Sequence, residues 1–242
     1  MTEYTERRYR KKVNAQGLQV FQVALKETDL LVSAGRSLIA ETRDRIFNSR
    51  HQIESYIRSH PDFRTALKPY ADDPLAPPLV RTMIETTRAV GVGPMASVAG
   101  AVAESVGAGL LGLTDQVIVE NGGDIFLKVA RPATISIFAG NSPLSEKIGL
   151  LVSTKKMPLG VCTSSGTVGH SYSMGIADAA CVIASSAALA DGAATALCNM
   201  IQGKGDLNRL GSWAGGINGV MGCLVILGDN LAAWGDVELV EL

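Results

Sequence analysis

Asp191 and Thr195 are the residues of this chain whose types and spacing best fit a metal site. They are four residues apart in A-D-G-A-A-T, so on a helix they project from one face. A carboxylate and a hydroxyl are hard oxygen donors, and magnesium takes one or two such protein ligands, with water and phosphate supplying the rest. The alternative is structural, with Asp191 capping a helix and Thr195 bonding back within it.

The stretch around them, residues 161–200, is almost free of long side chains. Small residues at this density indicate either closely packed backbones or room for a ligand. An ordinary core accounts for the small residues but less well for Asp178 and Asp191, which interrupt apolar runs. A buried carboxylate is costly unless a partner compensates its charge, so both aspartates are candidate site residues.

His170 is the only histidine beyond the N-terminal 60 residues, and it follows a hydroxyl-rich turn. Near neutral pH an imidazole accepts a proton from an attacking hydroxyl or donates one to a leaving phosphate. The alternative is a hydrogen-bonded core histidine. Asp178 lies eight residues further on, too far for one helical turn, so its pairing with His170 depends on the fold. We take both as candidate catalytic residues.

The segment 116–129, Q-V-I-V-E-N-G-G-D-I-F-L-K-V, has the pattern of strand, glycine turn and strand. Asn-Gly-Gly favours a tight hairpin turn, which is a purely structural explanation. Glycines also admit close approach of a ligand to the backbone. The pattern therefore predicts a hairpin and leaves a binding role open.

Composition limits the partners of this chain of 242 residues, which we expect to form one domain over 1–242. The net charge is −1, so we expect neither a nucleic-acid partner nor a membrane partner. The charged N-terminus lacks the apolar core of a signal peptide. Apolar segments without C-x-x-C spacing hold the cysteines, which predicts buried thiols in a reducing compartment, the cytoplasm: Cys162, Cys181, Cys198 and Cys223.

The order of the predicted elements is strands, helices, strands, helix and strands. An N-terminal strand meander spans 7–34, and a helix follows over 35–60, with a face of Arg, Glu and Asp that we expect to be exposed. A proline-rich arm occupies 61–78, before further helices and strands. This order predicts an α+β fold, a largely antiparallel sheet with helices packed on one face.

Three segments resemble the ApbE-like superfamily: V-I-V-E-N-G-G-D-I-F, V-C-T-S-S-G, and V-I-A-S-S-A-A-L-A-D-G-A-A-T-A-L. Its best-known members are FAD:protein FMN transferases, which cleave FAD in a magnesium-dependent reaction and attach FMN to a Ser or Thr of an acceptor protein. E-T-D-L and G-V-G-P-M-A-S-V-A-G resemble a divergent branch without an assigned activity. The resemblance covers roughly 90–200, and A-D-x-x-x-T is its most specific part.

The resemblance implies roles for individual residues. Asp191 and Thr195 match the magnesium ligands of the family. The glycine turn matches its flavin-nucleotide site, with a carboxylate that accepts from a ribose or ring N–H, and a Ser-Gly turn matches one whose amides and hydroxyls face phosphates. The residues at these two turns are Asn121, Gly122, Gly123 and Asp124, and Ser164, Ser165 and Gly166.

The chain departs from the transferases at two positions. Their A-K-G-x-A element corresponds to M-A-S-V-A-G, which has no lysine. Their H-I-I-D-P-x-T-G loop corresponds to His170 followed by S-Y-S-M-G-I-A-D, in which Asp178 is the counterpart of the loop aspartate. The nucleotide and metal residues are retained, while the elements of the transfer step are altered.

We therefore expect a magnesium-dependent enzyme that binds FAD or FMN, as an FMN transferase with an acceptor protein or as an FAD diphosphate hydrolase. One alternative is an enzyme on another phosphate-bearing metabolite. A second is a non-catalytic protein that retains the pocket. The altered elements favour these alternatives, and the pair Asp191 and Thr195 favours the flavin enzyme.

Overall fold

The computed structural model describes residues 17–168 and 173–242. The strands are β1 (Gln19–Leu25), β2 (Thr28–Ala34), β3 (Val117–Asn121), β4 (Asp124–Lys128), β5 (Ala133–Ser136), β6 (Ile148–Val152), β7 (Leu159–Ser164), β8 (Ala179–Ala184), β9 (Val220–Leu227), β10 (Asn230–Gly235) and β11 (Leu239–Glu241). The α-helices are α1 (Ile39–Ser59), α2 (Pro78–Val90), α3 (Val98–Leu110), α4 (Ala187–Met200) and α5 (Leu210–Ala214). Short 3₁₀ helices are η2 (Pro61–Arg64), η3 (Pro94–Ser97), η4 (Thr154–Lys156) and η5 (Lys204–Arg209).

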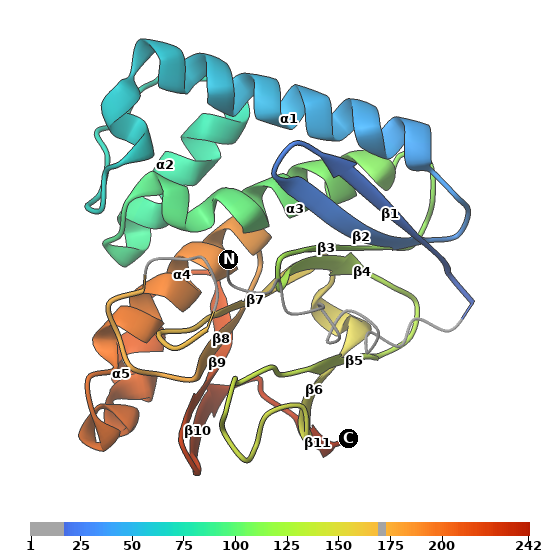
Figure 1. Ribbon diagram of the computed structural model, residues 1–242. Helices are drawn as coiled ribbons and strands as arrows, with labels where there is room; N and C mark the ends of the chain where they lie inside the picture. The colour runs from blue at the N-terminus through green and yellow to red at the C-terminus, as the bar shows by residue number, and fades with distance from the viewer. Residues whose placement is uncertain (1–16, 169–172) are drawn as a thin grey trace.

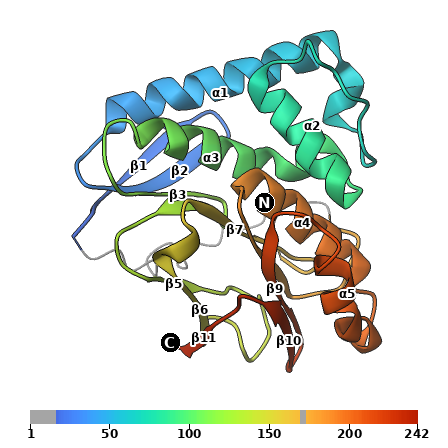
Figure 2. The ribbon, with the colours of Figure 1, turned by 180° about the vertical axis from the view of Figure 1, so that it is seen from behind.

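Two antiparallel sheets organise the fold (Figure 1). The larger sheet has eight strands in the order β1-β2-β3-β4-β7-β8-β9-β10, and the smaller has three in the order β11-β6-β5. Helices α1 to α4 lie against one face of the larger sheet, and the smaller sheet lies on the other side, as both views show (Figure 2). The predicted α+β class, with helices on one face of a largely antiparallel sheet, is confirmed.

Each central strand of the larger sheet serves two cores. Val119 and Val182 belong to the core under the helices, whereas their neighbours Ile118 and Ile183 belong to the core under the smaller sheet. This follows from the two-residue period of a strand, which points successive side chains to opposite faces. Strand β8 is consequently buried along its whole length.

Small residues let β7, α3 and α4 approach closely. A Cβ atom added at Gly100 in α3 would lie 2.2 Å from the carbonyl oxygen of Ala187, and one added at Gly160 in β7 would lie 2.2 Å from its Cα atom. Neither position has room for a side chain. Close backbone packing therefore accounts for part of the small-residue composition of the 161–200 stretch.

The N-terminal part of the described chain joins the sheet through distant pairings. Strand β2 pairs with β1 and, on its other side, with β3, where Ala34 is opposite Val117. Helix α1 follows β2, and the 61–78 segment contains η2 and then an irregular stretch. Hydrogen bonds tie this segment down, since the Tyr56 hydroxyl donates to Asp73 at 2.8 Å and the Tyr70 hydroxyl donates to Asp62 at 3.0 Å.

Among the described residues no single helix is long and apolar enough to cross a membrane. One pair of helical segments, Pro78–Val90 and Pro94–Leu110, reaches that length and composition together, with a bend of 103° between them. The four cysteines are free, and each is buried as predicted.

Candidate functional site

The glycine turn forms a tight hairpin between β3 and β4, as the sequence predicts. Asn121 is opposite Asp124, and Gly122 and Gly123 occupy the two turn positions with φ of 68° and 108°. Positive φ at both positions is the reason for the two glycines. A Cβ atom added at either would meet no atom within 4 Å, so the outer side of the turn is open. The Gly123 amide donates to Glu120 Oε1 at 2.8 Å, which fixes the turn.

Both the hairpin and α4 form hydrogen bonds with the first turn of α3. Asn121 Nδ2 donates to the carbonyl oxygen of Ala99 at 3.0 Å, and Asp191 Oδ2 accepts from the amide of Gly100 at 2.8 Å. A carboxylate is favourable there because a helix N-terminus carries partial positive charge. Asp191 thus caps α3 rather than its own helix α4, whose N-cap is Ser186.

Asp124, the first residue of β4, lies beside the end of β7. Its carboxylate accepts from the Thr163 amide and lies next to the Cys162 thiol, which donates to the carbonyl oxygen of Ala187 at 3.4 Å. Burial raises the pKa of Asp124 to about 7, and the nearby charge of Glu120 contributes.

Burial also raises the pKa of Asp191 well above its usual range, and the charge of Asp124 adds to this effect. Within 17–168 and 173–242 neither carboxyl forms an ion pair with a Lys, Arg or His side chain. A cation bound here would offset the cost of charging the two groups.

Thr195 lies one helical turn after Asp191 on α4 and is buried. Its hydroxyl makes no side-chain hydrogen bond with the part of the chain that the structure describes. No group of three or more His, Cys, Asp and Glu side chains in that part is arranged to hold a metal ion. Magnesium takes most of its ligands from water and phosphate, so a carboxylate and a hydroxyl with free lone pairs on one helix face fit this ion.

The Ser-Gly turn follows β7 next to the hairpin. Val161 pairs with Ile125 of β4, so the continuation of β7 to Ser164 runs alongside the glycine turn. The Ser164 hydroxyl is buried and has no hydrogen-bond partner among the described residues. Ser165 Oγ accepts from the amide of Val168 at 3.0 Å, and the Gly166 amide donates to Ala177 at 2.9 Å.

Asp178 has a different environment from Asp191. Its Oδ1 accepts from the Thr167 hydroxyl at 3.1 Å, and its Oδ2 accepts from the Gly228 amide at 2.7 Å. Both oxygens therefore hold neighbouring loops, and no hydrogen bond joins Asp178 to Asp191 within the described ranges. His170, the other predicted catalytic residue, lies outside the described residues.

The family model described as "AbpE bacteria" matches residues 10–211. The chain belongs to this ApbE-like family. A UPF0280 protein of Methanosphaerula palustris is 39% identical over 215 residues, which cover 88% of this chain and 89% of that protein. A UPF0280 protein of Methanosarcina barkeri is 40% identical over 223 residues, which cover 89% and 86% of the two chains.

Solved structures share the ApbE-like fold. The apo flavinyl transferase ApbE of Pseudomonas stutzeri superimposes with a TM-score of 0.57 and 17% identity, over 90% of this chain and 94% of that one. The ApbE protein of Thermotoga maritima gives a TM-score of 0.52 and 12% identity, over 88% and 96%. At these identities the likeness establishes the fold.

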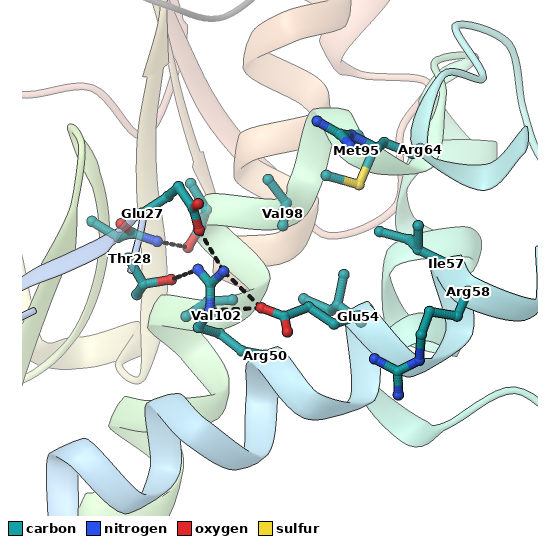
Figure 3. A pocket seen from close by; sticks show the side chains of 13 residues that line it. Glu27, Thr28, Arg50, Glu54, Ile57, Arg58, Arg64, Met95, Val98 and Val102 are labelled. Carbon is teal, nitrogen blue, oxygen red and sulfur yellow. Dashed lines mark hydrogen bonds and ion pairs between the residues drawn. The ribbon is translucent and has the colours of Figure 1, made fainter. Parts of the chain in front are cut away.

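A cavity that the sequence did not reveal borders the site of this ApbE-like chain (Figure 3). Its volume is about 540 Å³, and Asn121 and Ala99 form part of its wall. The other walls come from the β1–β2 turn, α1, η2, η3 and α3. Arg50 lies here with only 16% of its side chain exposed, although we expected the polar face of this helix to be in solvent. The sequence did show an arginine on that face, but an arginine there is equally typical of a solvent-exposed helix surface and of an anion site.

Proposed function

We propose that this ApbE-like chain is a magnesium-dependent enzyme that acts on a flavin nucleotide, FAD or FMN. One observation carries the proposal: Asn121 of the glycine hairpin and Asp191 of α4 both bind the first turn of α3. The candidate nucleotide and metal residues therefore meet around one helix N-terminus. The flavinyl transferase ApbE of Pseudomonas stutzeri, which shares the fold, supports the flavin class.

Asp191 and Thr195 are the residues that would hold magnesium. The ion, when bound, would supply positive charge that stabilises the negative charge developing on the diphosphate. Asp191 Oδ2 accepts from the Gly100 amide, and a carboxylate has further lone pairs with which to bind a metal ion. The N-terminus of α3 adds partial positive charge on the same side.

The remaining residues of the site would bind and orient the nucleotide. The open side of the turn at Gly122 and Gly123 leaves room for a ligand against bare backbone. The Ser164 hydroxyl, which is buried and has no partner within 17–168 and 173–242, would donate to a phosphate oxygen. The Asp124 carboxylate, which already accepts from the Thr163 amide, would orient the end of β7 and accept further from a ribose hydroxyl or a ring N–H.

Proton transfer falls to His170 in this proposal. It would accept the proton of the attacking hydroxyl, which comes from water in hydrolysis or from a Ser or Thr of an acceptor protein in transfer. Attack on the FMN phosphorus breaks the diphosphate, with AMP as the leaving group. Asp178 would serve as a positioning residue, because it accepts hydrogen bonds from the Thr167 hydroxyl and the Gly228 amide.

The test is incubation of the protein with FAD and magnesium, with and without an acceptor peptide, while AMP release and peptide mass are followed. We expect AMP release that requires magnesium. Flavinylation of the peptide would identify the transferase, and FMN in solution would identify the hydrolase. Nucleotide binding without AMP release in either case would contradict the enzyme and favour a binding protein.

Substitutions in the candidate site test the roles proposed for Asp191 and His170. Asp191→Asn removes a proposed metal ligand, so we expect magnesium-dependent FAD affinity to fall by about 100-fold while cooperative unfolding persists. Asp229→Asn is the matched control, since its side chain is 80% exposed on a turn, and it should bind as the wild type does. Equal affinities of Asp191→Asn and wild type in calorimetry would contradict the metal assignment. His170→Ala should bind FAD and release no AMP.

A further inference from the structure

The cavity beside the site combines apolar walls with arginines. Side chains of Ile53, Ile57, Met95, Val98 and Val102 form its apolar part, and Arg50, Arg58 and Arg64 line it as well (Figure 3). A volume of about 540 Å³ is in the range of small-molecule sites. This combination suits a ligand with a flat apolar group and a negative charge.

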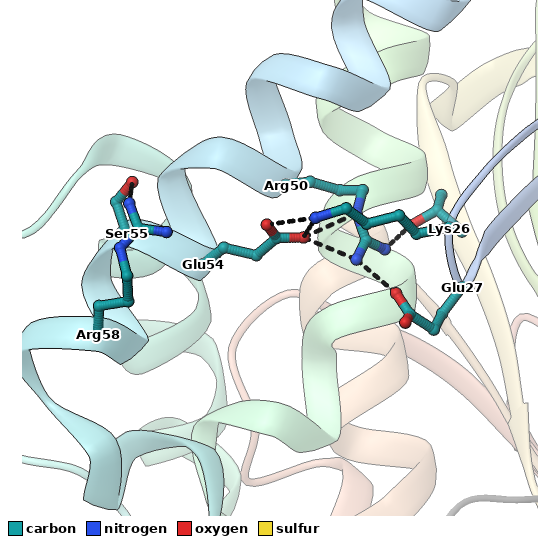
Figure 4. A network of polar contacts seen from close by, with 7 residues as sticks. Lys26, Glu27, Arg50, Glu54, Ser55 and Arg58 are labelled. Atoms are coloured by element: carbon teal, nitrogen blue, oxygen red, sulfur yellow. Dashed lines mark hydrogen bonds and ion pairs between the residues drawn. The ribbon is translucent and has the colours of Figure 1, made fainter.

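Arg50 is the best-oriented cation of the cavity (Figure 4). Its Nε and Nη2 donate to Glu54 Oε1 at 3.0 and 2.7 Å, and its Nη1 donates to the Thr28 hydroxyl at 2.8 Å. Nη2 also donates to Glu27 Oε2 at 2.5 Å. The guanidinium is thus fixed in a planar fork of the kind that binds phosphate oxygens.

Glu27 and Glu54 hold Arg50 with unequal strength. The Glu54 side chain is 34% exposed and is shared with Lys26, whose Nζ lies 2.8 Å away. The Glu27 side chain is 84% exposed and comes from the β1–β2 turn. An ion pair with such an exposed carboxylate contributes little to stability. An incoming anion can therefore replace Glu27 at small cost while Glu54 keeps the fork in place.

The other two arginines of the wall leave positive charge uncompensated. Arg58 donates to the Ser55 hydroxyl at 2.8 Å, and neither Arg58 nor Arg64 forms an ion pair with a carboxylate among the described residues. Against the carboxylates of Glu27 and Glu54, the three arginines leave the cavity net positive. Displacement of Glu27 by a ligand would leave a larger positive charge to be neutralised.

The cavity is continuous with the candidate nucleotide site. Asn121 and Ala99 line it and are joined by the 3.0 Å hydrogen bond at the base of the glycine hairpin. A ligand seated on the hairpin can therefore extend into the cavity. Arg50 approaches from α1 on one side, whereas Asp191 lies on α4 on the other side of the first turn of α3.

We propose that this cavity binds a phosphate group of a nucleotide through Arg50, and that the phosphate takes the place of the Glu27 carboxylate on the guanidinium. Glu27 thereby occupies the anion site in the free protein and moves away with the β1–β2 turn when the nucleotide binds. The apolar wall formed by Met95 and Val98 receives the ring system. The identity of the ligand as a flavin nucleotide rests on the proposed function, whereas the anion site rests on Arg50 and its partners.

Binding of FMN, riboflavin and inorganic pyrophosphate, measured by calorimetry, tests this site. Riboflavin has the ring but no phosphate, and pyrophosphate has no ring. Glu27→Gln removes the competing carboxylate, so we expect affinity for FMN and pyrophosphate to rise about two- to fivefold, with no change for riboflavin. Arg50→Lys keeps the charge but loses the planar fork, so we expect affinity for both anions to fall about tenfold.

Controls separate charge and folding from the site. Glu41→Gln makes the same charge change on α1, where Glu41 pairs with Arg36 at 3.8 Å, and should leave all affinities unchanged. Arg58→Gln and Arg64→Gln alter exposed side chains of the wall, so each should weaken anion binding about two- to fivefold with an unchanged melting temperature. These two variants keep the test valid if Arg50→Lys unfolds.

The outcomes distinguish the two proposals. FMN affinity that is indifferent to Glu27→Gln and to all three arginine variants overturns the anion site, while the proposed function stands. Pyrophosphate binding that depends on Arg50, without any FMN or FAD binding, supports the anion site and overturns the flavin assignment. Absence of binding of all three probes to the wild type overturns the anion site.

Discussion

The two faces of the eight-stranded sheet bury different kinds of side chain. Toward the helices, β4 and β7 present Asp124 and Ser164, both buried. Toward the smaller sheet, the same two strands present Ile125, Leu127 and Leu159. Adjacent residues of one strand thus differ in chemistry because they face different layers. The face toward the smaller sheet is apolar and stabilises the fold, whereas the face toward the helices keeps buried polar groups at a cost in stability.

The unfavourable groups on the helix side can be named. Asp124 is buried and Asp191 half-buried, and both carboxyls have raised pKa values. The Ser164 hydroxyl has no partner among the described residues. Groups of this kind lower stability in the free protein, and the proposed nucleotide and metal ion would compensate them. Truncating a side chain on the smaller-sheet face should therefore lower stability and leave ligand affinity unchanged. Removing a buried polar group on the helix face should raise stability and lower ligand affinity.

The largest expected effect is on the smaller-sheet side. Leu150 in β6 is 1% exposed and packs in the core between the two sheets. Leu150→Ala should lower the free energy of unfolding by about 2–5 kcal/mol through lost burial and a cavity, and leave FMN affinity of the folded protein unchanged. Denaturant unfolding and calorimetry measure the two quantities. Leu75→Ala, at a side chain that is 94% exposed, is the control that should change neither quantity. An altered FMN affinity of Leu150→Ala would contradict the assignment of different roles to the two faces.

An intermediate effect of opposite sign is expected on the helix side. Ser164→Ala removes a buried hydroxyl that no described residue partners, so the free energy of unfolding should rise by about 1 kcal/mol while FMN affinity falls about tenfold. Ser136→Ala is the matched control, because the Ser136 hydroxyl is also buried without a partner in the described part of the chain but lies in the smaller sheet. It should raise stability equally and leave affinity unchanged. If the two variants have the same FMN affinity, Ser164 does not contact the nucleotide.

The smallest effect concerns a contact away from both faces. The Tyr56 hydroxyl donates to Asp73 at 2.8 Å, and this bond lowers the pKa of Asp73. A lowered carboxyl pKa gives stability that is present above the unfolded value near 4 and is lost as pH falls toward the folded value. Tyr56→Phe should lower the melting temperature by about 1–4 °C at pH 7, and the difference should shrink below pH 4. A difference that is constant from pH 7 to pH 3 would contradict this account.

Local signals predicted much of the fold. The hairpin at 116–129 was predictable because Asn121-Gly122-Gly123 permits only a narrow choice of turns. The end of α2 was predictable because Gly91 adopts the left-handed conformation there, with φ of 80°. Strand β8 was not predicted as a strand, because residues buried on both faces show no alternation. Strand β10 was also missed, since N-L-A-A-W-G has no two-residue pattern.

The site was less predictable than the fold because the roles of its residues depend on distant partners. Asp178 and Asp191 look alike in the sequence, yet the first accepts from Gly228 and the second caps α3 through Gly100. The four-residue spacing placed Asp191 and Thr195 on one helix face. It could not show that Asp191 binds the first turn of α3, because Gly100 is distant in the sequence. Arg50 was taken for an exposed residue because its partner Glu27 is 23 residues away, beyond the reach of a helical pattern.

The pairing of β2 with β3 has a consequence for how the chain reaches its final form. These neighbouring strands are separated in the sequence by α1, α2 and α3. Strand β6, which also pairs with β5, is likewise separated from its other partner β11 by β7 to β10. Closing such long loops costs entropy before any contact offsets it, so proteins of this kind fold slowly. A nascent chain on the ribosome would carry the finished hairpin long before α4 emerges. Asp191 and Asn121 can therefore meet on α3 only after α4 has been synthesised.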